Sequence, residues 1–174
     1  MSEIPVIAFS AWSDTGKTTI IEKLIAEFKR RNIRVAVIKH DAHDFEIDRE
    51  GKDSWRFSHA GADITVISSK DKTALIEQRS LELKEAISLI HDVDLILAEG
   101  YNQEALPRIG ISRKATGKGF RRPLSEYIAI VTDEDPTVFA GIQTRSSDNP
   151  LPVFSLTSIP EIAEFILDFV QRSR

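Results

Sequence analysis

The chain has 174 residues, 41% of them hydrophobic, and this length and composition predict a single domain over residues 1–174 with its own core. Its net charge of -4 gives no reason to expect non-specific binding to nucleic acid or membranes, and the absence of cysteine excludes disulfides, thiolate metal sites and cysteine nucleophiles. Because no apolar run is long enough to span a membrane and the N-terminus lacks the pattern of a secretion signal, we expect a cytoplasmic protein.

The first predicted element is a buried strand over residues 4–9, and it leads into the segment AWSDTGKTT at residues 11–19. This segment matches the phosphate-binding loop (P-loop) pattern except at its first position, where Ala11 replaces glycine. Such a loop gathers backbone N–H groups around a phosphate, while its Lys reaches the outer phosphates and its Ser/Thr binds Mg²⁺. We therefore expect nucleotide contacts from Ser13, Asp14, Thr15, Gly16, Lys17, Thr18 and Thr19.

An amphipathic helix follows the loop, because Ile21, Leu24, Ile25 and Phe28 recur at helical spacing. The positive end of this helix would lie under the bound anion. Two features argue for modest nucleotide affinity. A positive φ at Ala11 would be strained, and the Asp14 carboxylate would repel the phosphates unless Mg²⁺ or a Lys offsets it.

A second buried strand is predicted over residues 35–39, and polar residues 40–52 follow it as a loop. Strands that alternate with amphipathic helices predict an α/β fold of the P-loop NTPase type, with a mostly parallel sheet covered by helices on both faces. We expect that Lys39 and Lys52 could reach phosphate oxygens, where a lysine acts as a point charge. The cluster His40, Asp41, His43 and Asp44 has a spacing that suits a transition metal, and contact with nucleotide or substrate and a plain solvated loop are its alternatives.

The middle of the chain alternates short elements. The pattern predicts a helix over 53–59, a third strand over 64–68, an edge-like strand over 73–78, a helix that Ser80 caps, and a buried strand over 94–99. Ligands of open α/β sheets bind at the carboxyl ends of the strands. Glu99 ends its strand there, so it is our candidate for the second acid of the magnesium site, beside Thr18. A solvated strand-end carboxylate is the alternative.

Residues 107–123 contain the basic residues Arg108, Arg113, Lys114, Lys118, Arg121 and Arg122 and no acid. We expect a strand at the start of this stretch and a mobile remainder. The basic segment either recognises an anionic, phosphate-bearing ligand or partner surface or is a solvated loop. Two further strands are predicted over 127–131 and 152–156, before a last amphipathic helix. The first of these strands places Asp133 where P-loop GTPases recognise guanine. The usual Asn-Lys-x-Asp signature is absent, however, and a turn before Pro136 explains the same acids equally well.

The chain resembles the MobB family, the molybdopterin-guanine dinucleotide biosynthesis adapter proteins. The resemblance covers most of the first 110 residues, in AWSDTGKTT with the following IEKLI, RVAVIKHDAHDFEIDREGKDS, AGAD and DLILAEGY. It implies a homodimer that binds GTP with Mg²⁺, hydrolyses it weakly, and assists the MobA-type guanylyltransferase that joins GMP to molybdopterin. Carried over to this sequence, it assigns Lys17 and Thr18 to phosphates and Mg²⁺ and Glu99 to the second acidic position. It leaves open whether molybdopterin itself contacts the chain.

Slow GTP hydrolysis would depend on Lys17 and Glu99 as the catalytic residues. Two other functions also fit the residues. An ATP-dependent small-molecule kinase would need an acceptor pocket and an arginine-bearing lid, for which residues 113–122 are the candidate. A non-catalytic partner-binding module would use nucleotide only to order residues 40–52. In each case we expect residues 40–52 and 113–122 to line the ligand site.

Overall fold

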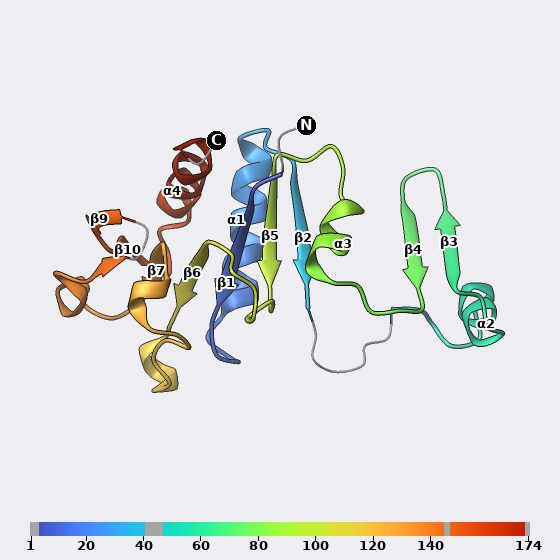
Figure 1. Cartoon of the computed structure of the whole chain (residues 1–174), viewed down its shortest axis with the longest axis horizontal. Helices are drawn as coiled ribbons and strands as arrows, with labels where there is room; N and C mark the ends of the chain where they lie inside the picture. Colours follow the sequence, from blue (N-terminus) through green and yellow to red (C-terminus); the bar gives the residue numbers. More distant parts are fainter. Residues whose placement is uncertain (1–3, 41–46, 145–146, 173–174) are drawn as a thin grey trace. The chain divides into compact units, whose positions relative to one another are not determined.

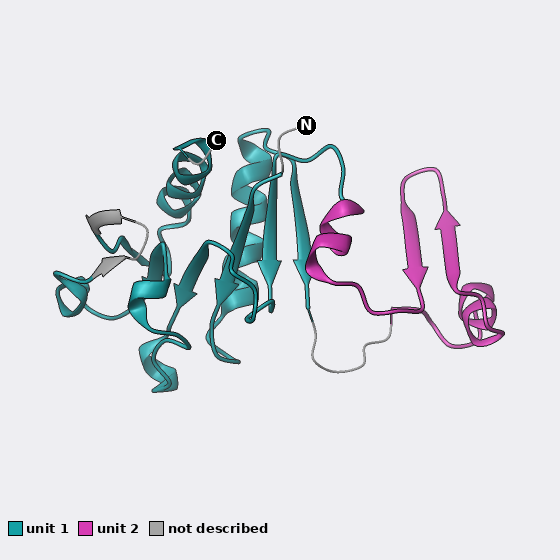
Figure 2. Cartoon of the chain, viewed as in Figure 1, with its two compact units in different colours: residues 1–40, 90–174 teal, residues 41–89 magenta. Residues whose placement is uncertain are grey.

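The structure, a computed structural model, describes residues 4–40, 47–144 and 147–172. The chain divides into two compact units (Figure 2). Unit 1 consists of residues 1–40 and 90–174, and unit 2 of residues 41–89. Unit 2 is therefore inserted between two segments that together make unit 1, and the single domain predicted from the sequence stays a prediction.

Unit 1 is built on a six-stranded sheet in which every pair of neighbouring strands is parallel. Across the sheet the strands are β10 (Val153–Ser155), β7 (Ala129–Thr132), β6 (Arg108–Ile111), β1 (Val6–Ser10), β5 (Leu95–Glu99) and β2 (Val35–Lys39). Because all neighbouring strands are parallel, the six carboxyl ends form one edge of the sheet, and the arrows of β1, β2 and β5 point the same way in Figure 1. Together with the helices this confirms the predicted α/β fold with a parallel sheet.

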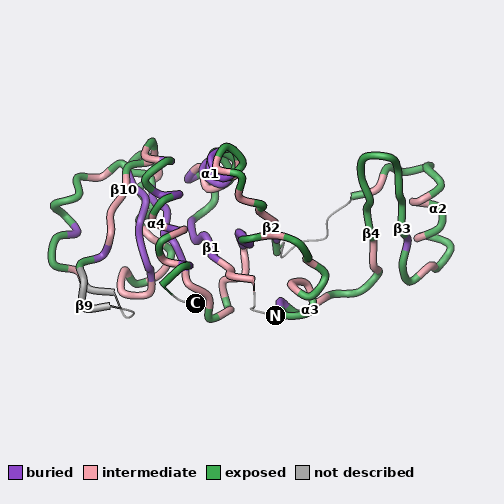
Figure 3. The backbone as a smooth tube through the Cα atoms, turned by 90° about the horizontal axis from the view of Figure 1, so that it is seen from above, coloured by how far each residue is buried: buried purple, intermediate pink, exposed green. Residues whose placement is uncertain are grey.

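Two helices, α1 (Lys17–Arg30) and α4 (Ile159–Arg172), pack on one face of this sheet. Their apolar stripes supply fully buried side chains such as Leu24, Phe28, Ile162 and Ile166, which meet the inward residues of the strands in one continuous core. Figure 3 colours the buried residues along α1 and β1 purple. No helix in the described part of the chain is both long and apolar enough to cross a membrane.

The other face of unit 1 carries a smaller apolar cluster around Tyr127. Tyr127 lies so close to Gly110 of β6 that a Cβ on this glycine would be 2.8 Å from the ring. Unit 1 also contains short elements: the 3-10 helices η1 (Lys114–Thr116), η2 (Leu124–Glu126) and η3 (Pro136–Phe139), and the antiparallel pair β8 (Gln143–Thr144) and β9 (Ser147–Pro150). Only glycine at residue 110 leaves room for this ring.

The connection between β5 and β6, residues 100–107, contains no helix. Arg108, which is 3% exposed, holds this connection from within, because its Nη2 donates to the carbonyl oxygens of Tyr101 at 3.3 Å and Glu104 at 2.6 Å. Burial and the nearby Arg122 cation both lower the pKa of Arg108. The buried guanidinium therefore holds this helix-free connection against the start of β6, the strand to which Arg108 belongs.

Unit 2 differs from the sequence prediction in its topology. It contains α2 (Asp53–His59), β3 (Ile64–Ser68), β4 (Thr73–Glu77) and α3 (Leu83–Ser88). The predicted strands over 64–68 and 73–78 both form, but among the described residues β3 and β4 pair only with each other, as an antiparallel hairpin outside the parallel sheet. The Ser69 to Lys72 turn closes the hairpin, with the Ser69 N–H donating to the Lys72 carbonyl oxygen at 2.8 Å.

The helix expected to begin at Ser80 is capped two residues later. Glu82 is the N-cap residue of α3, and its side chain accepts from the backbone of Glu85 while Glu85 accepts from the backbone N–H of Glu82. This reciprocal pair is a capping box in which a glutamate takes the place of the usual Ser or Thr. The prediction of Ser80 as the cap was therefore wrong.

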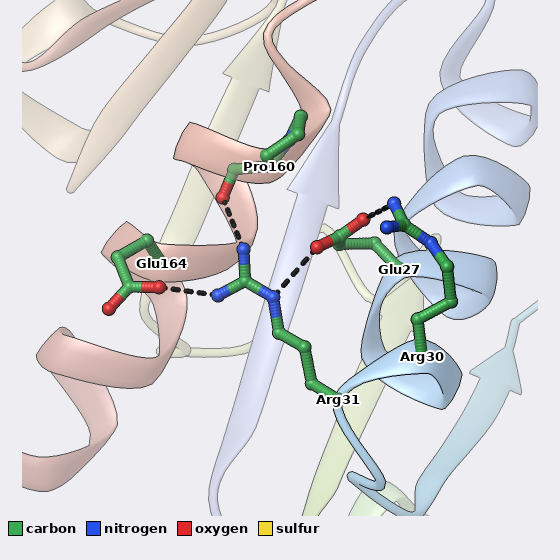
Figure 4. A network of polar contacts seen from close by, with 5 residues as sticks. All are labelled: Glu27, Arg30, Arg31, Pro160 and Glu164. Carbon is green, nitrogen blue, oxygen red and sulfur yellow. Dashed lines mark hydrogen bonds and ion pairs between the residues drawn. The ribbon is translucent and has the colours of Figure 1, made fainter.

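A polar network joins the C-terminal end of α1 to the first turns of α4 (Figure 4). Glu27, whose side chain is 5% exposed, accepts hydrogen bonds from Arg30 and from Arg31, whose Nε lies 2.7 Å from Glu27 Oε1. Arg31 also donates to the Pro160 carbonyl oxygen at 3.1 Å and to the Glu164 carboxylate. Arg31 thus satisfies a buried acid and bridges two helices at once.

We expect Arg31→Ala to lower the free energy of unfolding by about 1–3 kcal/mol, because it removes the bridge to α4 and the better-buried partner of Glu27. Urea denaturation measures this loss. Arg30→Ala is the matched control, since the Arg30 side chain is 71% exposed, and it should cost under about 0.5 kcal/mol. Equal losses in the two variants would show that the bridge between the helices contributes nothing.

Candidate functional site

The register of the parallel sheet places the predicted loop between two strand ends. Phe9 of β1 lies opposite Glu99 of β5, and Ser10 lies opposite Gly110 of β6. On the far side of β5, Lys39 of β2 also pairs with Glu99. The chain leaving β1 therefore emerges with the end of β5 on one side and the end of β6 on the other, as the P-loop arrangement requires.

The loop conformation agrees with its glycine and aspartate content. Within residues 11–19 the positive φ values are those of Asp14, at 68°, and Gly16, at 87°. Asp tolerates this region better than most residues and glycine adopts it freely. Ala11 is not among the positive-φ residues and is 4% exposed in the core, so the strain that a missing glycine would have caused there is absent.

Helix α1 begins directly after the loop with its first turn open. Its N-cap residue is Gly16, no side chain caps the end, and no acid occurs in the first turn. The N–H groups of that turn have no acceptors within the helix, and the helix dipole adds positive charge at the same place. Thr18 and Thr19 are exposed there, whereas the Thr15 hydroxyl turns inward and donates to the Trp12 carbonyl oxygen at 2.8 Å. An anion is the ligand that suits this end.

Lys17 and Glu99 form an ion pair at this edge. Lys17 Nζ lies 2.5 Å from Glu99 Oε1, and the two side chains are 20% and 13% exposed. The pair joins the start of α1 to the end of β5, residues 82 positions apart in sequence. The structure therefore brings together two of the residues that the sequence singled out as separate candidates.

The donor set at this place fits magnesium. The Thr18 hydroxyl and the Glu99 carboxylate are hard oxygen ligands, which Mg²⁺ prefers together with water and phosphate oxygens. No group of three or more His, Asp or Glu side chains suited to a metal occurs among the described residues. Protein side chains would thus supply only part of a magnesium shell here, as in sites where the nucleotide phosphates complete it.

The end of β2 is held close to Glu99. The His40 N–H donates to the Glu99 carbonyl oxygen at 2.9 Å, and the His40 ring lies 5.4 Å from that of Tyr101, centroid to centroid. A Cβ on Gly100, whose φ is 98°, would be 2.4 Å from the His40 carbonyl oxygen, so this position requires glycine. The rest of the proposed metal cluster, Asp41, His43 and Asp44, lies outside the described residues.

Asp133 has a structural contact that the sequence did not suggest. It follows β7, is exposed, and its Oδ1 accepts from the Lys114 N–H at 2.6 Å. In the chain just before Asp133 and Arg113, the buried hydroxyl oxygens of Thr132 and Ser112 lie 3.0 Å apart. The aspartate therefore anchors the segment that follows β6, and its role in base recognition remains a prediction.

Trp12 is the loop residue that sequence analysis missed. It is 40% exposed, and the Arg121 guanidinium carbon lies 5.4 Å from the centroid of its ring. A lone tryptophan in an otherwise small and polar loop was the available signal. Lys118 also approaches the loop, with its Nζ 3.5 Å from the Ser13 carbonyl oxygen. Residues 113–122, expected to be mobile, thus make defined contacts with the loop.

Comparison with known proteins identifies the family. The family model described as "Molybdopterin guanine dinucleotide synthesis protein B" (MobB) matches residues 6–133. A molybdopterin-guanine dinucleotide biosynthesis adapter protein of Haemophilus influenzae is 34% identical over 173 residues, covering 95% of this chain and 89% of that protein. The adapter protein of Escherichia coli K12 is 32% identical, covering 97% and 95%.

Solved structures give the same answer for the fold. A crystal structure titled molybdopterin-guanine biosynthesis protein B superposes with a TM-score of 0.69 at 28% identity, covering 95% of this chain and 99% of that one. Bacillus subtilis MobB superposes with a TM-score of 0.71 at 24% identity, covering 94% and 96%, and supports the fold alone. The P-loop-type fold, the position of the loop beside β5 and the match to residues 6–133 agree, and the chain belongs to the MobB family.

Proposed function

We propose that this protein is a GTP-binding adapter of molybdopterin-guanine dinucleotide synthesis, with at most weak GTPase activity. The observation that carries the proposal is the Lys17–Glu99 ion pair at the open N-terminal end of α1, in a chain of the MobB family. The names of the Haemophilus influenzae and Escherichia coli relatives support the adapter role.

In this proposal the nucleotide phosphates lie on the N–H groups of the loop around Gly16, and Lys17 turns from Glu99 to the outer phosphates. Thr18 and the released Glu99 carboxylate would hold Mg²⁺, whose charge offsets that of the phosphates. Ser13, Asp14, Thr15 and Thr19 complete the loop. Lys39, His40 and Asp133 line the same edge from the ends of β2 and β7.

Hydrolysis would be slow because, once Lys17 moves from Glu99 to the phosphates, the Glu99 carboxylate holds Mg²⁺ and is not a free base directed at a water molecule. Binding exchanges one set of favourable charge contacts for another, which limits the net gain in affinity. Such a site suits a protein that holds GTP while a partner acts, and we propose a MobA-type guanylyltransferase in the cytoplasm as that partner.

The β3–β4 hairpin supports a homodimer. Ile64, Val66 and Leu75 share one face of the hairpin and are 52%, 59% and 50% exposed. Thr65, on the opposite face, is 7% exposed and contacts Ser58 of α2. In Figure 3 the tube along β3 and β4 is mostly in the colours of exposed and half-buried residues. A two-stranded hairpin is marginally stable alone, so we propose that a second copy of the chain covers the bare face.

The nucleotide site is tested by titrating the protein with GTP and with ATP in Mg²⁺, and again in EDTA, by calorimetry. We expect a preference for GTP, and Lys17→Ala should weaken binding in Mg²⁺ by at least about tenfold, because a charge-assisted contact to phosphate is lost.

Glu99→Gln separates the two roles of the acid. It should weaken binding by about tenfold in Mg²⁺ but not in EDTA, since the substitution removes a metal ligand and also frees Lys17. Lys23→Ala, an exposed lysine elsewhere on α1, is the control and should bind as the wild type does. Absence of nucleotide binding by the wild type would contradict the proposal, and stoichiometric phosphate transfer from ATP to a small acceptor would favour the kinase alternative.

The dimer is tested by substituting Val66→Lys together with Leu75→Lys and measuring molar mass by light scattering after gel filtration. We expect the wild type to be a dimer and the double variant a monomer, because two buried ammonium groups would oppose association. Nucleotide binding should persist in the monomer. Leu89→Lys, which alters another apolar side chain of unit 2 that is 52% exposed, is the control. A monomeric wild type, or a double variant that stays dimeric, would exclude this interface.

A further inference from the structure

Residues 113–122 form a segment, here called the basic strap, that is anchored at both ends. At its start the Lys114 N–H donates to Asp133 Oδ1 at 2.6 Å. At its end the Arg122 N–H donates to the Tyr127 hydroxyl oxygen at 2.9 Å, and Tyr127 is 1% exposed in the smaller apolar cluster. Because both anchors belong to unit 1, the strap has a defined place relative to the sheet.

The strap directs three cations at the phosphate-binding loop. The Arg113 guanidinium lies against Gly16, with Nη2 3.2 Å from the point where a Cβ of that glycine would be. Further along, Lys118 donates to the Ser13 carbonyl oxygen, and Arg121 lies over the Trp12 ring. The contacts cover successive parts of the loop, from its first residues to the start of α1.

The positive charges that the strap brings to the loop are not balanced by negative charges of the protein. The N-terminal end of α1 is already positive, and Glu99 balances only the charge of Lys17 in its first turn. None of the three strap cations has an ion-pair partner in the described part of the chain, and the only acid within the loop is exposed Asp14. Cations gathered around a positive helix end repel one another unless an anion lies between them. A polyphosphate between the loop and the strap would remove that repulsion.

We infer that three side chains of the basic strap, those of Arg113, Lys118 and Arg121, form the second wall of the nucleotide site and that Arg113 is a phosphate-binding residue supplied by the chain itself. The inference rests on the proposed nucleotide binding and names a contact beyond the loop motif. A guanidinium suits the position because its planar fork donates two parallel hydrogen bonds to phosphate oxygens. Lys118 adds a second charge that offsets Asp14, and the Arg121–Trp12 contact keeps the strap on the loop.

The test is calorimetric titration of the full chain with GTP and Mg²⁺, at low and at moderate salt. Arg113→Ala should weaken binding by about 10- to 100-fold, and Arg113→Lys by less, because a lysine keeps the charge but not the fork. The salt dependence of the affinity should also fall in Arg113→Ala, since a charge contact is lost. Lys114→Ala is the matched control: this exposed neighbour retains the N–H that Asp133 accepts, and its variant should bind within about twofold of the wild type.

The outcomes separate this inference from the proposed function. If the wild type binds GTP and Arg113→Ala binds equally well, the strap is not part of the phosphate site and the inference is overturned. If Lys114→Ala weakens binding as much as Arg113→Ala does, the effect belongs to the net charge of the segment, and a specific role for Arg113 is excluded. If the wild type itself binds no nucleotide, the proposed function fails and the inference fails with it. Thermal unfolding of each variant confirms that the fold is kept, as expected for exposed side chains.

Discussion

The hydrogen bonding of β1 on both of its edges is the constraint on which the site depends. Since β5 and β6 pair with β1 in parallel and in fixed register, the chain that leaves β1 must begin its loop between the carboxyl ends of these two strands. One neighbour supplies Glu99 at that point and the other leads into Arg113. A slip of one residue in either ladder would turn the side chains of that strand to the opposite face of the sheet, and the buried core on the α1 and α4 face makes such a slip costly.

Many of the strands and helices and the phosphate-binding loop could be predicted, because each depends on the pattern of residues within a short segment. The strand over 35–39 and the helix over 53–59 have the bounds that apolar spacing and flanking residues indicate. The loop is recognisable because its chemistry demands particular residues in a fixed order. By contrast, an apolar run such as ITVIS fits a central parallel strand or a hairpin equally well, since periodicity does not identify the partner strand.

The unpredicted parts of the site are contacts between distant residues. Lys17 and Glu99 were each identified from their own surroundings, but the ion pair between them depends on the order of strands in the sheet. The same holds for the contact between Arg121 and Trp12, because the loop pattern fixes no residue type at position 12 and Arg121 lies outside it. The excess of basic residues within residues 107–123 suggested an anion-binding role for that segment. Its anchoring by Asp133 and Tyr127, however, depends on where β7 lies, which the sequence does not show.

The hydrogen bonds from Arg108 to the connection between β5 and β6 limit where residues can be inserted into this protein. Surface connections usually accept insertions, and they are the customary places for grafting tags or splitting a chain. An insertion in residues 100–107 would draw the carbonyl groups of Tyr101 and Glu104 away from Arg108 and leave a buried cation without acceptors. The turn at residues 69–72 is held by a hydrogen bond between its own ends and supplies no acceptors to a buried cation. Engineered additions therefore suit the hairpin tip better than the connection at residues 100–107.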